Sequence, residues 1–190
     1  MIRHSRVKQL CISALMVALC VILPLVFHAI GLGGAFSPMH LPVLLCGLLC
    51  GPWYGLACGV LGPVISNLIT GMPAAAKLVS MIPELAVYGF GCGLLMQLIH
   101  TKKTLLDIFL SMIPAILLGR IIGGAVKAAV LISEAKGYSV AAWATAYFAE
   151  TIPGTILQLV LLPVLYFALM KAKVIPQRYP KGEKVTQSNE

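Results

Sequence analysis

Long apolar runs, separated by short polar stretches or by glycine and proline, make up most of this sequence of 190 residues. Runs of this length and composition are typical of helices that cross a membrane. The pattern predicts six helices, over about residues 9–30, 38–50, 54–70, 78–100, 105–132 and 142–170. Because 59% of the residues are hydrophobic and only 11% are charged, we expect an all-α integral membrane protein, built as a bundle of six transmembrane helices.

The segment 37–76 contains no charged residue, although prolines interrupt it repeatedly. Glycine recurs at every fourth position through its middle, at Gly47, Gly51, Gly55 and Gly59. On helices these glycines would lie along one face and allow close backbone packing. We therefore predict a tight helical hairpin, buried among the other helices. Because its first helix, 38–50, is short for a hydrocarbon core of about 30 Å, we expect it to be shielded by neighbours, tilted, or continued by the preceding loop.

The basic residues decide between two topologies. An alternative with five spans fuses 38–60 into one helix, but it would place Lys102, Lys103 and the basic C-terminal segment outside the cell, against the positive-inside rule. Six spans place most basic residues in the cytoplasm: Arg3, Arg6, Lys8, Lys102, Lys103, Lys171, Lys173, Arg178, Lys181 and Lys184. We therefore expect both termini to be cytoplasmic. The net charge of +8 then reflects topology, and we expect no binding of nucleic acid.

We expect one membrane domain over 1–175, followed by a flexible, basic and polar tail over 176–190. The N-terminal cations and the apolar run after them resemble a signal peptide. However, the run over 10–27 is longer than the roughly 7–15 residues of a signal core. We interpret it as a first span that is retained.

Four ionisable residues, Glu84, Arg120, Lys127 and Glu150, fall inside predicted spans. Such side chains are costly in lipid and usually face a bundle interior or a water-filled cavity. The helical rise of about 1.5 Å per residue places all of them in the outer half of the membrane. We therefore predict a small pocket that opens to the exterior and binds a substrate through His40, Asn67, Glu84, Tyr88, Arg120, Lys127, Glu150 and Gln158.

A purely structural interpretation of the same residues stays open. Arg120 could pair with Glu84 or Glu150 only to hold helices together. Lys127 could reach from its helix to the membrane surface, and His40 could lie at that surface. An ion-pair role and a pocket are compatible with each other.

Several chemistries have no motif here. The sequence contains no Gly-x4-Gly-Lys-Ser/Thr phosphate loop, no His-Glu-x-x-His and no Gly-x-Ser-x-Gly. All six cysteines lie inside apolar runs, where thiols usually pack as small apolar side chains. We therefore expect no ATPase activity of the chain's own, no metal, no cofactor and no catalysis.

Three features together carry a family resemblance. A hairpin opens at His40-Leu-Pro42, turns at Gly51-Pro-Trp-Tyr-Gly55 and ends at Thr70-Gly-Met-Pro73. Ala14-x-x-x-Ala18 lies in the first predicted span. The plan of about 20 kDa, six spans, cytoplasmic termini and a basic tail is the third feature. In these respects the chain resembles the substrate-binding S components of energy-coupling factor (ECF) vitamin importers.

The resemblance implies the protein's function and partners. Such a subunit captures a small water-soluble vitamin or precursor outside a bacterial-type plasma membrane. It works with a transmembrane coupling subunit, on which Ala14 and Ala18 would dock, and with two ATP-binding subunits, and it tips in the bilayer to release its cargo inside. The resemblance allows pantothenate, folate, pyridoxine-precursor or ribazole-type cargo. Arg120 and Lys127 could clamp a carboxylate, which favours a pantothenate-like acid, whereas Glu84 and Glu150 favour a neutral or cationic ligand.

Two functions of other classes compete with this interpretation. One is a self-sufficient carrier driven by an ion gradient. The other is a small intramembrane enzyme that uses Glu84 or Glu150 as a base, although such an enzyme usually needs a metal or a nucleophile as well.

Overall fold

The structure is a computed structural model that describes residues 6–29, 31, 38–133, 145, 151–175 and 178–179. This part of the chain is helical and contains no strand. Its helices are α1 (Arg6–Ala29), α3 (His40–Cys50), α4 (Pro52–Thr70), α5 (Ala75–Leu98), α6 (Thr104–Ser133) and α8 (Ile152–Lys171). The predicted all-α fold is confirmed for these residues, and most helix bounds agree with the predicted spans to within a few residues. The start of the last predicted span, 142–150, lies largely outside the described residues.

Five of these helices, α1, α4, α5, α6 and α8, are long and apolar enough to cross a membrane. The sixth, α3, has only 11 residues. At about 1.5 Å per residue it is roughly half as long as a hydrocarbon core is thick. A chain with several such helices is a multi-pass membrane protein.

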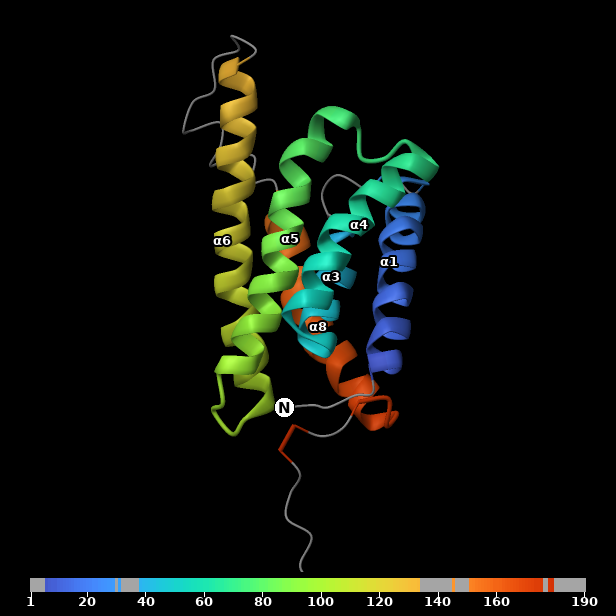
Figure 1. The fold of residues 1–190 in the computed structure, drawn as a ribbon. Helices are drawn as coiled ribbons and strands as arrows, with labels where there is room; N and C mark the ends of the chain where they lie inside the picture. Colours follow the sequence, from blue (N-terminus) through green and yellow to red (C-terminus); the bar gives the residue numbers. More distant parts are fainter. Residues whose placement is uncertain are drawn as a thin grey trace, which may run out of the picture.

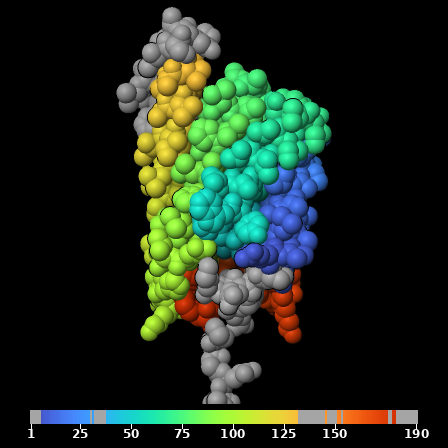
Figure 2. Space-filling model, in the orientation of Figure 1, coloured from blue at the N-terminus to red at the C-terminus, as the bar shows by residue number. Residues whose placement is uncertain are grey.

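The helices form one bundle, in which α1, α4, α5 and α6 follow one another across the front and α8 lies behind them (Figure 1). One end of the bundle carries the α4–α5 connection, and we call it the α4–α5 end. The opposite end carries the α5–α6 connection, together with the start of α1 and the end of α8, and we call it the α5–α6 end. The space-filling view shows α4 and α5 packed side by side on the front face (Figure 2).

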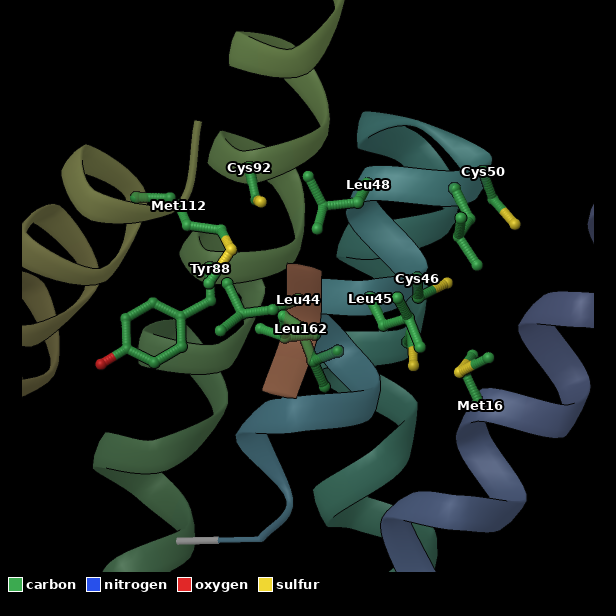
Figure 3. Packing of buried hydrophobic residues seen from close by; sticks show 14 of the residues in the cluster. Met16, Leu44, Leu45, Cys46, Leu48, Cys50, Tyr88, Cys92, Met112 and Leu162 are labelled. Carbon is green, nitrogen blue, oxygen red and sulfur yellow. The ribbon is translucent and has the colours of Figure 1, made fainter. Parts of the chain in front are cut away.

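The short helix α3 lies at the centre of the bundle. Every residue of α3 except Leu41 is buried. Leu44 and Leu48 join a core cluster that also contains Tyr88 of α5, Leu162 of α8 and Met16 of α1 (Figure 3). The prediction that neighbouring helices shield this short element is therefore confirmed.

Glycines bring α3, α4 and α5 into backbone contact. A Cβ atom added to Gly89 of α5 would overlap the carbonyl oxygen of Gly55 of α4, and one added to Gly47 of α3 would overlap that of Gly89. No side chain larger than hydrogen fits at these crossings, as in other close helix pairs. The predicted close packing of the glycine-rich hairpin is thus confirmed, with α5 as its partner.

Candidate functional site

A buried carboxylate lies where α3 and α5 meet. Glu84 and Tyr88 are one helical turn apart on α5, and the Tyr88 hydroxyl donates a hydrogen bond of 2.8 Å to Glu84 Oε1. His40, the first residue of α3, places Nε2 3.7 Å from the same oxygen, and its ring centroid is 5.2 Å from that of Tyr88. Glu84 is 9% exposed and Tyr88 1%. We call Glu84, Tyr88 and His40 the Glu84 cluster.

The backbone of α6 packs directly against this cluster. A Cβ atom added to Gly123 would lie 2.8 Å from Glu84 Oε2, and one added to Gly119 would overlap the Tyr88 ring. Glycine at both positions therefore lets α6 reach the buried carboxylate. The sequence prediction missed these two residues, although their four-residue spacing is the same signal that marked the hairpin.

Arg120 follows Gly119 on α6 and connects this region to α8. It is 7% exposed, and it interacts electrostatically with Tyr88. Its NH1 group donates to Thr151 Oγ1, just before the start of α8, and its NH2 group donates to Thr155 Oγ1 at 2.6 Å. Four elements, α3, α5, α6 and α8, thus supply polar side chains to one buried region.

Gln158 extends the same face of α8 one turn further. Thr151, Thr155 and Gln158 are spaced four and three residues apart, so they lie on one side of the helix. Gln158 is 2% exposed, and this side of α8 packs against α3 and α6. The predicted inward position of Gln158 is confirmed. The two threonines were not predicted.

The remaining predicted site residues are more dispersed. The Asn67 amide donates to the Pro73 carbonyl at 2.7 Å, so this group holds the α4–α5 connection. Lys127 is half-buried on α6, two turns beyond Arg120. Glu150 lies outside the described residues. On α1, Ala14 and Ala18 are both exposed, as a docking surface requires.

Two structural alternatives concern the pairing of Arg120 with a glutamate and the position of His40. The contacts described for Glu84 are those with Tyr88 and His40, so the suggested Arg120–Glu84 ion pair is not among the salt bridges of the described residues. Pairing of Arg120 with Glu150 falls outside them. His40 is 8% exposed, so its imidazole lies inside the bundle.

The site is suited to binding by hydrogen bonds and charge. It offers a carboxylate, an imidazole, a guanidinium, three hydroxyls and a carboxamide on four elements. Within the described residues, no group of three or more His, Cys, Asp or Glu side chains is arranged to hold a metal ion. A small polar molecule with several hydrogen-bonding groups would find partners here.

A second buried polar cluster lies at the α5–α6 end and was not predicted. Asp107, in the first turn of α6, is fully buried. Its Oδ1 accepts hydrogen bonds from the backbone N–H and the hydroxyl of Thr101, and its Oδ2 accepts from Arg178 and Tyr179. The two partners on the C-terminal side come from the segment that was predicted as a tail.

Comparison with known proteins gives one result that covers most of the chain. Residues 8–172 match the family model described as "ECF transporter, substrate-specific component". A search of the curated proteins and a search of the solved structures each found no match. The match agrees with the resemblance inferred from the hairpin and from the small residues of α1. The chain therefore belongs to the family of substrate-specific components of ECF transporters.

Proposed function

We propose that this protein captures a small water-soluble vitamin or vitamin precursor from outside the cell, as the binding subunit of an ECF-type importer. Separate subunits, a transmembrane coupling protein and two ATP-binding proteins, supply the energy. Family membership supports the general role. The observation that supports capture by this chain is the meeting of the Glu84 cluster with Arg120, Thr151 and Thr155 inside the bundle.

The proposed topology has six crossings, cytoplasmic termini and a place in a bacterial-type plasma membrane. Exposed lysines gather at the α5–α6 end, where Lys102 and Lys103 lie between helices and Lys171 and Lys173 lie at and after the end of α8. Excess positive charge of this kind marks the cytoplasmic side. The α4–α5 end then faces the exterior.

In this orientation the site lies nearer the outside. Glu84 is nine residues from the start of α5, or about 14 Å, and about 21 Å from its other end. The α6 backbone at Gly119 and Gly123 lies at the same level, because it packs on Glu84 and Tyr88. A ligand would therefore enter from the α4–α5 end and stop partway through the bundle.

The ligand would be held by groups of both charges. Arg120 can bind a carboxylate through two parallel hydrogen bonds, which favours an acid such as pantothenate; folate, a pyridoxine precursor or a ribazole remain alternatives. Glu84 and His40 would bind donor groups of the ligand. Asn67, Lys127 and Glu150 stay in the proposal as further candidates for the entrance.

Docking on the coupling subunit would use α1. Ala14 and Ala18 are exposed one turn apart, and small residues at this spacing let another helix approach closely. The region carries no charge between Lys8 and His28. Such a surface suits a helix of a membrane partner.

The most direct test is mass spectrometry of the small molecules that remain bound to the purified full-length protein. We expect one vitamin-like molecule in about equimolar amount. Addition of that molecule should raise the melting temperature, since a ligand of the folded state stabilises it. If the protein retains no small molecule and none of the four vitamin classes stabilises it, the proposal is wrong.

A further inference from the structure

Gln158 is a polar residue inside the bundle for whose side chain the described part of the protein provides no hydrogen-bond partner. The residue is 2% exposed, and no hydrogen bond of its amide is found among the described residues. Its neighbours on the same face of α8 differ in this respect. Thr155 accepts from Arg120 and donates to the Thr151 carbonyl at 2.9 Å, so its hydroxyl has a partner both as donor and as acceptor.

A buried amide without a partner is unfavourable. Removing such a group from water without a new hydrogen bond costs free energy, and most buried polar groups in proteins are therefore paired. An unpaired amide inside a protein therefore needs an explanation. In a binding protein, the simplest explanation is that a ligand forms the missing hydrogen bonds.

Gln158 also lies at the boundary between the polar and apolar parts of the bundle. Toward the α4–α5 end, the next turn of its face holds Thr155 and its contact with Arg120. Toward the α5–α6 end, the next turn holds Leu162, which is fully buried in the core with Leu44 of α3 (Figure 3). Tyr166, one turn further, is also fully buried in this core. A molecule that enters from the α4–α5 end would meet Gln158 last.

We propose that Gln158 forms the floor of the binding site and recognises a neutral ligand group that is both a donor and an acceptor, such as a carboxamide, a lactam or a ureide. This inference rests on the proposed function. A primary amide offers one carbonyl oxygen and one NH2 group, so a second amide satisfies both ends through two parallel hydrogen bonds. A carboxylate would leave the Gln158 oxygen unpaired, and an ammonium group would leave its NH2 unpaired.

The ligand is then a molecule with two different ends. Its neutral amide-like end lies deep, against Gln158. Its charged or hydroxylated end lies closer to the entrance, beside Arg120 and the Glu84 cluster. A site that pairs a specific polar group rejects analogues without that group strongly, because its own buried groups are then left unpaired.

Two substitutions on one face of α8 test this role. Gln158→Met keeps the length of the side chain but removes the amide. Tyr166→Phe is the control, because it removes a hydroxyl that is buried without a hydrogen-bond partner among the described residues and that lies two turns deeper. Each full-length variant is purified, and the retained small molecule is identified and quantified by mass spectrometry. The melting temperature is measured after the molecule is washed out.

We expect the wild-type protein to retain a molecule that contains a carboxamide, lactam or ureide. Gln158→Met should retain at least about tenfold less of it while its ligand-free melting temperature rises by roughly 2–4 °C. Tyr166→Phe should retain as much as the wild type. Three results would overturn the inference about Gln158 but not the proposed function. They are retention by Gln158→Met equal to that of the wild type, a fall in the melting temperature of this variant, and a retained molecule without a carboxamide, lactam or ureide. A wild-type protein that retains no small molecule and is stabilised by none of the four vitamin classes contradicts the proposed function itself.

Discussion

Arg178 donates a hydrogen bond of 2.6 Å from Nε to Asp107 Oδ2 and so joins two residues that lie 71 positions apart in the chain. A second donor group of Arg178 reaches the carbonyl oxygens of Met96 and Ile99, where α5 ends. A cation at the C-terminal end of a helix is favourable, because the last carbonyl groups carry partial negative charge. Arg178 is therefore bound to the end of α5 and to the first turn of α6.

This ion pair should contribute strongly to stability. Asp107 has no exposed surface, so Asp107→Ala would leave the partly buried Arg178 without its counter-charge and should lower the free energy of unfolding by about 3–5 kcal/mol. The double variant Asp107→Ala/Arg178→Met should lose less than the sum of the single changes. Thermal unfolding of the wild type, of the single variants Asp107→Ala and Arg178→Met, and of the double variant measures the coupling between the two side chains. Purely additive losses would show that the two side chains act independently.

The helix crossing at Gly55 and Gly89 should tolerate no methyl group. Because an added Cβ at Gly89 overlaps the backbone of Gly55, we expect Gly89→Ala to lower stability by at least about 1–3 kcal/mol. Gly91→Ala is the control, since its Cβ would lie 3.4 Å from that of Ala115, an ordinary contact. The melting temperatures of the two variants show whether Gly89→Ala destabilises the protein more than Gly91→Ala does. Equal effects would mean that α4 and α5 can separate at little cost.

The two buried tyrosines should respond differently to loss of their hydroxyls. The Tyr88 hydroxyl donates to the Glu84 carboxylate, and a hydrogen bond to a charged group contributes about 1.5–3 kcal/mol. Tyr88→Phe should therefore destabilise the protein by about that amount and weaken ligand binding. Tyr166→Phe should change stability by less than about 0.5 kcal/mol or raise it. A Tyr88→Phe variant as stable as Tyr166→Phe would contradict the proposed arrangement of the Glu84 cluster.

Arg120 should matter more for ligand affinity than for assembly of the protein in the membrane. Arg120→Ala removes the charge and the contacts with Thr151 and Thr155, and we expect ligand affinity to fall by at least about tenfold. Lys77→Ala, at an exposed lysine near the start of α5, is the control and should bind normally. Titration calorimetry with the molecule that mass spectrometry identifies measures both. If Arg120→Ala is poorly expressed but the remaining protein binds normally, Arg120 only connects α6 to α8.

Much of the fold could be predicted because a membrane helix can be recognised from the apolar composition of its own segment. Apolar length set most helix bounds to within a few residues, and the four-residue glycine spacing indicated the close packing around Gly47 and Gly55. The cost of burying charge in lipid correctly indicated that Glu84 and Arg120 lie inside the bundle. Each of these inferences depends on one segment of sequence and its surroundings in the bilayer.

What could not be predicted depends on which segments meet. Arg120 finds its hydroxyl partners 31 and 35 positions later, and nothing in α6 indicates that threonines, and not a carboxylate, face it. The polar segment around Arg178 is unremarkable by composition and was expected to be a flexible tail, yet Arg178 and Tyr179 bind Asp107. Pairings of this kind follow from tertiary packing, which periodicity does not contain.

The most direct measurement of the proposed role is affinity capture of the tagged full-length chain from its native membrane, with identification of the proteins that accompany it. We expect one larger helical membrane subunit and two ATP-binding proteins. Ala14→Trp, on the exposed face of α1, should lose all three while its ligand remains bound. Val160→Trp, at an exposed position of α8, should keep them. Capture of a lone monomer or dimer that takes up its substrate by means of an ion gradient would contradict the proposal.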